Sequence, residues 1–379
     1  MQSDISFYYT LPYLAMASLY FFLFLLELKI KSALIKKSIC LACPIIFFLF
    51  WGFRGFVATD WKHYCPMFEN KLFDSVFMEP GFILLTTLIR FCTDNYFCYQ
   101  MVLTGFSIII LQYLFIKYSP FQSLSWFIWQ SCFLIYHDLL RFFIAILIVY
   151  SSFQYIFQKN MLRYFLMVVI ASTFHISVIL FLPLYFLIDR KYSEKIYWII
   201  LLLCLLAFIF DFSGLELFLR YLHIFTHKSD LYVTGTFANS KMNMSFLGIL
   251  PLTAFYIYGV LYYQKLSLNK YGNLFFNLYV VFFIIVCSLN DNGEVQRRLS
   301  YLFRMSWCFL LPIYLQLPLK LPKKIITFLI VIYGFRQCNS YNNIMWKYEN
   351  TLFTNITQYE ERKVEISIIS KSLGTAGNN

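Results

Sequence analysis

The chain of 379 residues is too apolar for a soluble domain, because 60% of its residues are hydrophobic and only 13% are charged, against roughly 45–50% apolar residues in soluble proteins. Its formal net charge of +12 would indicate a nucleic-acid-binding protein only if the basic side chains gathered on one soluble face, and they are scattered in short loops between apolar runs. The sequence therefore predicts an all-α polytopic membrane protein with no nucleic-acid partner.

The basic loops predict the orientation of the first segments. An apolar run over residues 7–26 is followed at once by lysines between residues 29 and 37, so the positive-inside rule puts this loop in the cytoplasm and the N-terminus outside. The second run, residues 38–53, then returns to the outer side. Residues 54–81 are therefore predicted to be an external loop.

Further apolar runs follow along the chain. Residues 82–92 are too few to cross a bilayer and suit an interfacial helix. Together with the first two runs, eight more segments give about ten transmembrane helices. These segments are residues 96–116, 121–136, 141–157, 196–210, 246–263, 274–289, 299–315 and 325–335.

The apolar stretch over residues 164–188 needs another explanation, because a full crossing there would put every later basic loop outside. A re-entrant or interfacial helical hairpin with His175 near its tip restores the alternation. A second external loop then covers residues 211–245. We therefore predict an integral membrane domain over residues 1–338 and a soluble C-terminal tail over residues 339–379.

The loop after the second span carries the first candidate site residues. Arg54, Asp60, Trp61 and Tyr64 lie just outside a membrane segment, where charges cost free energy unless something pairs with them. A guanidinium can hold a phosphate through two parallel hydrogen bonds, and the aromatic rings could stack on sugars. The alternative is an Arg54–Asp60 ion pair that only fixes the loop.

Two more candidates flank short turns. Glu79 precedes the turn signal Pro80-Gly81, which either presents the carboxylate to the loop or lets it open the following helix as an N-terminal charge. Arg141 follows the tight external corner that begins at Tyr136, and it is either a phosphate clamp or a snorkelling anchor. His137 and Asp138 in the same corner could also pair with Arg141.

The remaining polar candidates lie inside apolar runs. His175 is suited to proton transfer or phosphate contact because imidazole titrates near neutrality, although a structural hydrogen bond is the alternative. Arg298 and Arg304 put cations at two depths of the ninth span, whereas Arg297 could simply pair with Glu294.

Other site types have little support. His223 and His227 are spaced like helical metal ligands, but no third ligand is evident, so we expect no metal. The sequence contains no P-loop, dinucleotide fingerprint or nucleophile elbow. We therefore expect no cofactor.

Five short motifs occur in a fixed order along the chain. They are Arg54…Thr59-Asp60…Tyr64, Glu79-Pro80-Gly81-Phe82, Arg141-Phe142-Phe143-Ile144-Ala145, Ile170-Ala171…Phe174-His175-Ile176-Ser177 and Arg298…Tyr301-Leu302-Phe303. Over residues 40–315 this order resembles the EpsG family of bacterial surface-polysaccharide polymerases, relatives of the Wzy-type O-antigen polymerases. Two positions depart from the family pattern. Ala58 stands where Gly is usual, and Trp61 stands where Tyr is usual.

The resemblance implies a multispanning glycosyltransferase of GT-C-like architecture in the bacterial inner (cytoplasmic) membrane, with its active site facing the periplasm. Such an enzyme would transfer a growing glycan from undecaprenyl diphosphate to the non-reducing end of a lipid-linked repeat unit. Its implied partners are the undecaprenyl-diphosphate-linked oligosaccharide, membrane lipid and a chain-length regulator protein. The product, whether O-antigen, capsule or exopolysaccharide, is left open.

Roles can be given to the candidates on this basis. Fixed cations would stabilise the departing diphosphate, and a base must take the proton of the acceptor hydroxyl. The candidate cations are Arg54, Arg141, Arg298 and Arg304, and the candidate bases are Asp60, Glu79 and His175. An O-antigen ligase, which differs only in its acceptor, and a lipid-linked oligosaccharide flippase remain alternatives, although the sequence lacks the internal repeats common in transporters.

Overall fold

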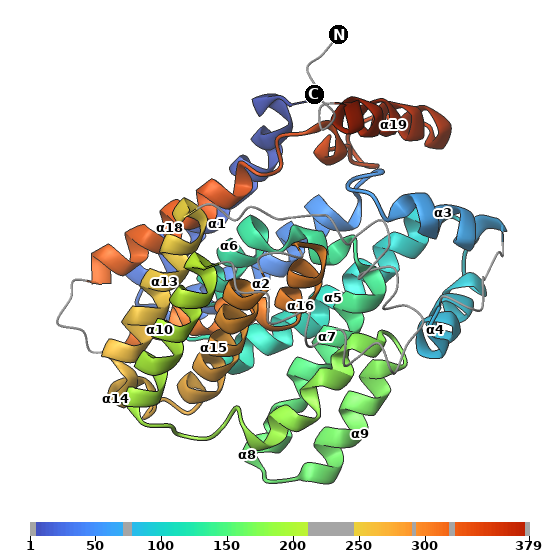
Figure 1. The fold of residues 1–379 in the computed structure, drawn as a ribbon. Helices are drawn as coiled ribbons and strands as arrows, with labels where there is room; N and C mark the ends of the chain where they lie inside the picture. Colours follow the sequence, from blue (N-terminus) through green and yellow to red (C-terminus); the bar gives the residue numbers. More distant parts are fainter. Residues whose placement is uncertain (1–4, 71–77, 211–245, 290–292, 318–322, 376–379) are drawn as a thin grey trace. The chain divides into compact units, whose positions relative to one another are not determined.

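The computed structural model describes residues 5–70, 78–210, 246–289, 293–317 and 323–375 (Figure 1). Within these ranges the regular secondary structure is helical, with two isolated β-bridges and no strand, so the predicted all-α fold is confirmed. The chain forms two compact units. Unit 1 contains Met1–Leu182 and Ile330–Asn379, and unit 2 contains Pro183–Leu329.

Unit 1 holds most of the predicted site residues. Its helices, including α18, which begins in unit 2, are α1 (Phe7–Lys29), α2 (Ala33–Phe47), η1 (Phe48–Gly52), α3 (Trp61–Asn70), α4 (Pro80–Arg90), α5 (Tyr96–Tyr118), α6 (Gln122–Cys132), η2 (Leu134–His137), α7 (Leu140–Ser152), α8 (Gln154–Phe157), α9 (Met161–Ser172), η3 (Ile176–Phe181), α18 (Lys323–Cys338), η5 (Ile344–Trp346) and α19 (Tyr359–Thr375).

Unit 2 is smaller. Its helices are η4 (Pro183–Phe186), α10 (Glu194–Ile209), α13 (Phe246–Leu261), α14 (Tyr263–Leu266), α15 (Gly272–Ser288), α16 (Gly293–Arg304) and α17 (Trp307–Gln316). Two side-chain amides of α15 tie down the segment that precedes α10. Asn277 donates to the carbonyl of Ile188 at 2.9 Å, and Asn273 donates to the carbonyl of Asp189 at 2.9 Å.

Several helices are built to cross a bilayer. In the described part of the chain, four are long and apolar enough to do so, namely Phe7–Lys29, Ala33–Gly52, Tyr96–Tyr118 and Leu140–Phe157. At 1.5 Å per residue, 20 residues span about 30 Å, the thickness of the hydrocarbon core. Shorter apolar helices lie at six further places, so the membrane class is confirmed and the total of ten crossings stays a prediction.

Local signals explain where two of these spans begin. The Ser6 side chain accepts from the Tyr8 N–H at 3.2 Å, and the Asn95 side chain accepts from the Phe97 N–H at 2.8 Å. These caps satisfy N–H groups that have no partner within α1 and α5.

One end of unit 1 carries the basic loops. Glu27, near the end of α1, accepts from the Ser123 N–H at 3.1 Å at the start of α6. Lys117, at the end of α5, donates to the side chain of Gln154 in α8 at 2.6 Å. We call this the basic end, defined by residues 27–37, 117–123 and 154–163.

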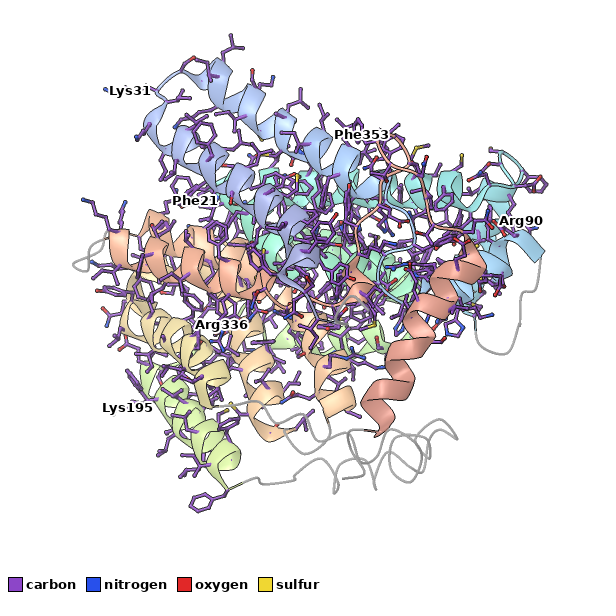
Figure 2. All side chains as sticks on the ribbon, turned by 90° about the horizontal axis from the view of Figure 1, so that it is seen from above. Phe21, Lys31, Arg90, Lys195, Arg336 and Phe353 are labelled. Carbon is purple, nitrogen blue, oxygen red and sulfur yellow. The ribbon has the colours of Figure 1, made fainter. Side chains whose placement is uncertain are left out.

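The other ends of these helices form what we call the site end, defined by residues 54–64, 79–81, 137–141 and 173–175. The second span reaches it through the π-helical turn η1, a helix irregularity often found near functional sites. Figure 2 shows Lys31 of the basic end well away from Phe353. The segment that contains Phe353 contacts the chain just before the site end, where the Thr351 N–H donates to the carbonyl of Phe53 at 2.8 Å.

The predicted hairpin is present in unit 1. After α9 the chain turns at residues 173–175 and returns as η3. The Tyr164 hydroxyl in the first arm donates to the carbonyl of Phe181 in the second at 2.7 Å. His175 lies at the tip, as the alternation of basic loops predicted.

One predicted span is divided in the structure. The single span expected over residues 299–315 is two helices, because α16 ends at Arg304 and α17 begins at Trp307. In α16 the side chains of Arg297 and Arg298 are exposed while Leu302 is buried, so this helix is amphipathic rather than uniformly apolar. The predicted second external loop, residues 211–245, lies outside the described residues.

The segment after residue 338 was predicted to be a soluble C-terminal tail, and its place outside the membrane stays a prediction. It belongs to unit 1 and packs on the loop after the second span. The Gly55 N–H donates to the carbonyl of Glu349 at 2.8 Å, and the Ala58 N–H donates to the carbonyl of Met345 at 2.8 Å. Hydropathy alone could not predict this packing, because it does not show which main-chain N–H and C=O groups the segment hydrogen-bonds.

Candidate functional site

An ion pair joins two predicted site residues at the site end of unit 1. Arg141, in the first turn of α7, lies with its Nη1 2.6 Å from Oε2 of Glu79, which directly precedes α4. The Arg141 Nε also donates to the hydroxyl of Tyr64 in α3 at 3.3 Å. The side chains of Arg141 and Glu79 are 24% and 18% exposed, so this pair is partly screened from solvent and still reachable.

A second carboxylate fixes the neighbouring loop. Asp138, buried in the corner before α7, accepts from the backbone N–H of Thr59 at 3.1 Å and from that of Asp60 at 3.0 Å. Burial, followed by the nearby charge of Asp60, raises the pKa of Asp138 to about 7. Asp138, three residues before Arg141, thereby anchors the backbone of the predicted base Asp60. Our sequence analysis considered Asp138 only as a partner for Arg141 and missed this contact.

Arg54 contacts the same corner from the interior of unit 1 and is buried, with only 3% of its surface exposed. Its guanidinium donates to the carbonyls of Trp51 and His137, both at 2.9 Å, and to the Thr104 hydroxyl at 3.1 Å. Burial lowers the pKa of Arg54 to about 10, which leaves it protonated at neutral pH. In this arrangement Arg54 ties the second span, α5 and the corner before α7 together.

The hairpin tip closes the same end. The Gly81 N–H at the start of α4 donates to the carbonyl of Thr173 at 2.8 Å. The ring of His175 packs edge-on against Phe142, next to Arg141, with centroids 5.3 Å apart, and its Nδ1 lies 2.8 Å from the Ser177 hydroxyl. The tip therefore brings His175 toward α7 and buttresses the segment that carries Glu79.

The sequence model of the EpsG family matches residues 36–348. The chain belongs to the EpsG family. Members of this family are Wzy-like polysaccharide polymerases, so the predicted resemblance is confirmed and a polymerase-type role is supported. No curated protein and no solved structure matches the chain.

The matched region contains the whole cluster of this EpsG chain. It begins within α2 and ends between η5 and Glu349. It includes Asp60, Glu79, Asp138, Arg141 and His175, while α19 lies beyond it.

The two predicted sugar-stacking aromatics of the EpsG chain lie in the core of unit 1. Trp61 is 2% exposed, donates from Nε1 to the carbonyl of Ala58 at 3.1 Å and packs on Phe56. Tyr64 is 4% exposed, and burial raises its pKa to about 12. Tyr64 therefore stays protonated and supports Arg141, and stacking of either ring on a sugar stays a prediction.

The other two predicted cations are in unit 2. Arg298 lies exposed on α16, and the guanidinium carbon of Arg304 lies 5.0 Å from the ring centre of Trp307. Convergence of these two arginines with Arg141 stays a prediction. The spaced pair His223 and His227 lies outside the described residues, and among the described ones no group of three or more His, Cys, Asp or Glu side chains could hold a metal.

Ala58 shows how this EpsG chain keeps its loop without the usual glycine. Its φ of 67° is in the left-handed region, where glycine is free of strain and alanine is not. The hydrogen bonds of its N–H to Met345 and of its carbonyl to Trp61 hold it there. The departure from the family pattern therefore leaves strain at the start of the Thr59-Asp60 turn.

Ala58 variants should reveal this strain. We expect Ala58→Gly to keep the stability of the protein and Ala58→Val to lower it by about 2 kcal/mol, because a β-branched residue is poorly tolerated at positive φ. Thermal unfolding of the purified protein in detergent measures both. Equal unfolding temperatures for the two variants would argue against strain at Ala58.

Gly81 gives a second prediction. A Cβ there would lie 2.3 Å from the Thr173 hydroxyl oxygen and 2.9 Å from the Thr173 carbonyl oxygen. We therefore expect Gly81→Ala to separate α4 from the hairpin tip, with a loss of about 1–3 kcal/mol and shorter polymer. The control is Gly105→Ala in α5, whose new Cβ would meet the Phe48 ring at 3.2 Å, a contact that a small ring shift relieves. Matching thermal stability and polymer length for the two variants would contradict the prediction.

Proposed function

We propose that this EpsG protein is a polysaccharide polymerase that moves a growing glycan from undecaprenyl diphosphate to the non-reducing end of a lipid-linked repeat unit. The observation that carries the proposal is the partly exposed ion pair of Arg141 and Glu79, next to the anchored turn at Asp60. Membership of the EpsG family supports the reaction class. The four residues of this site, Arg141, Glu79, Tyr64 and Asp60, come from three separate segments of unit 1.

Arg141 is the cation best suited to the diphosphate. A guanidinium fits phosphate oxygens through parallel hydrogen bonds, which are strong where water is scarce. An incoming diphosphate competes with Glu79 for Arg141, since both are anions. When the glycosidic bond to the diphosphate breaks, negative charge grows on the departing oxygen, and a fixed cation stabilises that charge. Arg54 acts indirectly, by holding the corner that carries Arg141.

The proton must leave the acceptor hydroxyl as its oxygen attacks the anomeric carbon. In our proposal Asp60 takes this proton, because its backbone is fixed by Asp138 close to Arg141. Glu79, released from Arg141 by the diphosphate, and His175 are the alternative bases. The bond formed joins the acceptor oxygen to the anomeric carbon, the bond broken frees undecaprenyl diphosphate, and no nucleotide is consumed.

The charge distribution supports a periplasmic site. Lysines gather at the basic end of unit 1, and the positive-inside rule puts that end in the cytoplasm. The site end then faces the periplasm, where flipped lipid-linked repeat units are presented. Cysteine labelling from outside the cell tests this directly in a background that carries Cys92→Ser and Cys98→Ser, because Cys92 is exposed and Cys98 is partly exposed. In that background His63→Cys, at an exposed position, should react with a membrane-impermeant maleimide, and Lys31→Cys should not.

Deletion of the gene tests the reaction class. The proposal predicts that cells without the protein make surface glycan with single repeat units and no longer chains, and that the intact gene restores the ladder. Free lipid-linked polymer that is not attached to its acceptor would instead indicate a ligase. Precursors trapped on the inner leaflet would indicate a flippase.

A further inference from the structure

The segment after α18 holds the candidate loop, and the family match covers only the first part of this segment, up to residue 348. Four main-chain groups of the loop, at Gly55, Phe56, Ala58 and Lys62, bond to it. The Gly55 N–H donates to the carbonyl of Glu349 at 2.8 Å. The carbonyl of Lys62 accepts from the Tyr359 hydroxyl at 3.1 Å. We call the residues of this segment that make these contacts and support them the C-terminal clamp, namely Ile344, Met345, Lys347, Glu349, Tyr359, Arg362 and Glu365.

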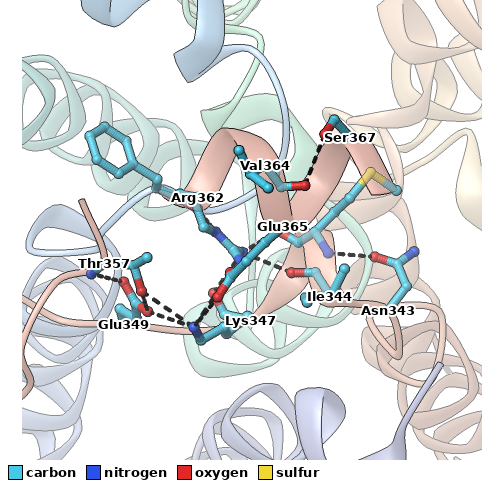
Figure 3. Close-up of polar contacts among 12 residues, drawn as sticks. Asn343, Ile344, Lys347, Glu349, Thr357, Arg362, Val364, Glu365 and Ser367 are labelled. Atoms are coloured by element: carbon cyan, nitrogen blue, oxygen red, sulfur yellow. Dashed lines mark hydrogen bonds and ion pairs between the residues drawn. The ribbon is translucent and has the colours of Figure 1, made fainter. Parts of the chain in front are cut away.

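Arg362 is the centre of the C-terminal clamp (Figure 3). Its side chain is fully buried and donates from Nε to the carbonyl of Phe56 at 3.1 Å. Its Nη2 donates to the carbonyl of Ile344 at 2.8 Å, and its Nη1 lies 2.6 Å from the carboxylate of Glu365. One planar guanidinium thus links the loop, η5 and α19, a geometry that a lysine cannot copy.

Charged neighbours stiffen the clamp itself. The Lys347 ammonium lies 3.2 Å from both the Glu349 and the Glu365 carboxylates (Figure 3). Glu349 also accepts from the Thr357 N–H at 2.9 Å. These contacts join residues 347–349 to residues 357–365. They therefore hold the carbonyl of Glu349 and the side chain of Arg362 in fixed positions relative to each other where they contact the loop.

The clamp and Asp138 bond to different groups of the same loop. Asp138 holds the N–H groups of Thr59 and Asp60, while the clamp holds the main chain at Phe56, Ala58 and Lys62. Ala58, in its strained conformation, is held by the clamp through its N–H and directly precedes the Thr59 N–H that Asp138 holds. Removal of either set leaves buried main-chain groups without partners and frees the turn that carries Asp60.

We propose that Arg362 is a positioning residue for glycan transfer, which acts by fixing the main chain of residues 55–62 so that Asp60 lies beside Arg141. This inference rests on the proposed function for the reaction that it serves. The C-terminal clamp is thus a working part of the site, although Arg362 and the rest of α19 lie beyond the residues that the family model matches.

The test compares Arg362→Ala with Lys363→Ala, a matched loss of one cation in the same turn of α19. Lys363 is exposed and pairs with Glu360 at 3.8 Å on the surface. Each purified protein is studied in nanodiscs, with lipid-linked repeat units extracted from the deletion strain. Turnover per folded protein, KM for the repeat unit and deuterium exchange of residues 55–62 are measured.

We expect Arg362→Ala to lower the turnover number about tenfold or more and to speed exchange of residues 55–62 by a similar factor, with KM changed less than about twofold. Lys363→Ala should behave as wild type. A purely structural role would reduce the yield of folded protein and leave its turnover unchanged, and that result would overturn the inference. Faster exchange with normal turnover would overturn it too.

A milder variant covers the case in which Arg362→Ala does not fold. Tyr359→Phe removes only the hydroxyl that donates to Lys62, and it should give a smaller change of the same kind in both exchange and turnover. Unchanged values in both would overturn the inference. If wild-type protein transfers no glycan in the assay, the proposed function fails, whereas the exchange data still report whether Arg362 fixes the loop.

Discussion

Arg141→Ala is expected to abolish polymer longer than one repeat unit while the protein still reaches the membrane. The side chain supplies the partly exposed guanidinium of the cluster and pairs with Glu79 at 2.6 Å. Loss of one fixed group that stabilises developing charge typically costs about 10²–10³ in turnover. Arg141→Lys keeps the charge but cannot reach Glu79, Tyr64 and a phosphate together, so we expect a loss of about tenfold.

Arg163→Ala is the matched control for Arg141. It removes an exposed arginine from the first turn of α9, at the basic end of unit 1. Electrophoresis of the surface glycan and turnover of the purified protein measure all three variants. Full-length ladders from Arg141→Ala, or equal losses from Arg141→Ala and Arg163→Ala, would remove the basis for the proposed site.

Asp138→Asn is expected to reduce polymerisation about a hundredfold, although Asp138 is not expected to touch the substrate. A carboxylate accepts from both the Thr59 and Asp60 N–H groups, whereas an amide offers one oxygen and turns its own N–H₂ toward a donor. A buried unsatisfied group costs about 1–3 kcal/mol, which is enough to release the turn. Asp94→Asn, an exposed carboxylate before α5, is the control and should leave activity unchanged.

The raised pKa of Asp138 gives this prediction a pH signature. Burial raises that pKa from its usual 3.8 to about 7, so protonation weakens the hold on the turn and turnover should fall as the pH drops through about 7. Stability should change in the opposite direction. Between pH 4 and 7 the folded state binds this proton more strongly than the unfolded state does, so the free energy of unfolding decreases as the pH rises.

Profiles of turnover and thermal stability across this pH range measure both trends. In Asp138→Asn, turnover should no longer fall as the pH drops through about 7, and thermal stability should lose the part of its pH dependence that comes from this carboxyl. A wild-type turnover that is flat through pH 7, or a variant that keeps the full wild-type pH dependence in both profiles, would show that another group is responsible.

The membrane architecture of unit 1 could be predicted because it follows from local properties of the chain. Apolar runs predicted the spans that became α1, α5 and α7 to within a few residues. The alternation of basic loops was enough to predict the hairpin with His175 at its tip. Both predictions depend only on whether a given chain segment prefers the bilayer or water.

The contacts of the site could be predicted only in part, because they join distant segments. The sequence indicated that Glu79 and Arg141 were both site candidates, but not that they pair. It placed Arg54 at the membrane surface, whereas acceptors from α5 and from the corner bury its guanidinium. It showed that Ala58 breaks the family pattern, but only the backbone revealed that the turn keeps its left-handed residue.

The C-terminal clamp was missed for a related reason. Residues after 338 are polar enough to look like a tail, and nothing in their composition indicates that Arg362 fits between two main-chain carbonyls. A buried arginine in a polar segment becomes visible only when its partners are known. Polar segments that directly follow a last membrane span are therefore worth testing for contacts with the loops at the same end.

Titration of the purified protein with a soluble isoprenyl diphosphate, such as farnesyl diphosphate, tests the central claim most directly, because it measures diphosphate binding without the transfer reaction. Calorimetry should detect saturable binding to the wild type that Arg141→Ala weakens about thirtyfold or more, the loss expected for a charge-assisted contact of about 2 kcal/mol, and that Arg163→Ala leaves unchanged. Equal affinity of the wild type and Arg141→Ala would contradict the account.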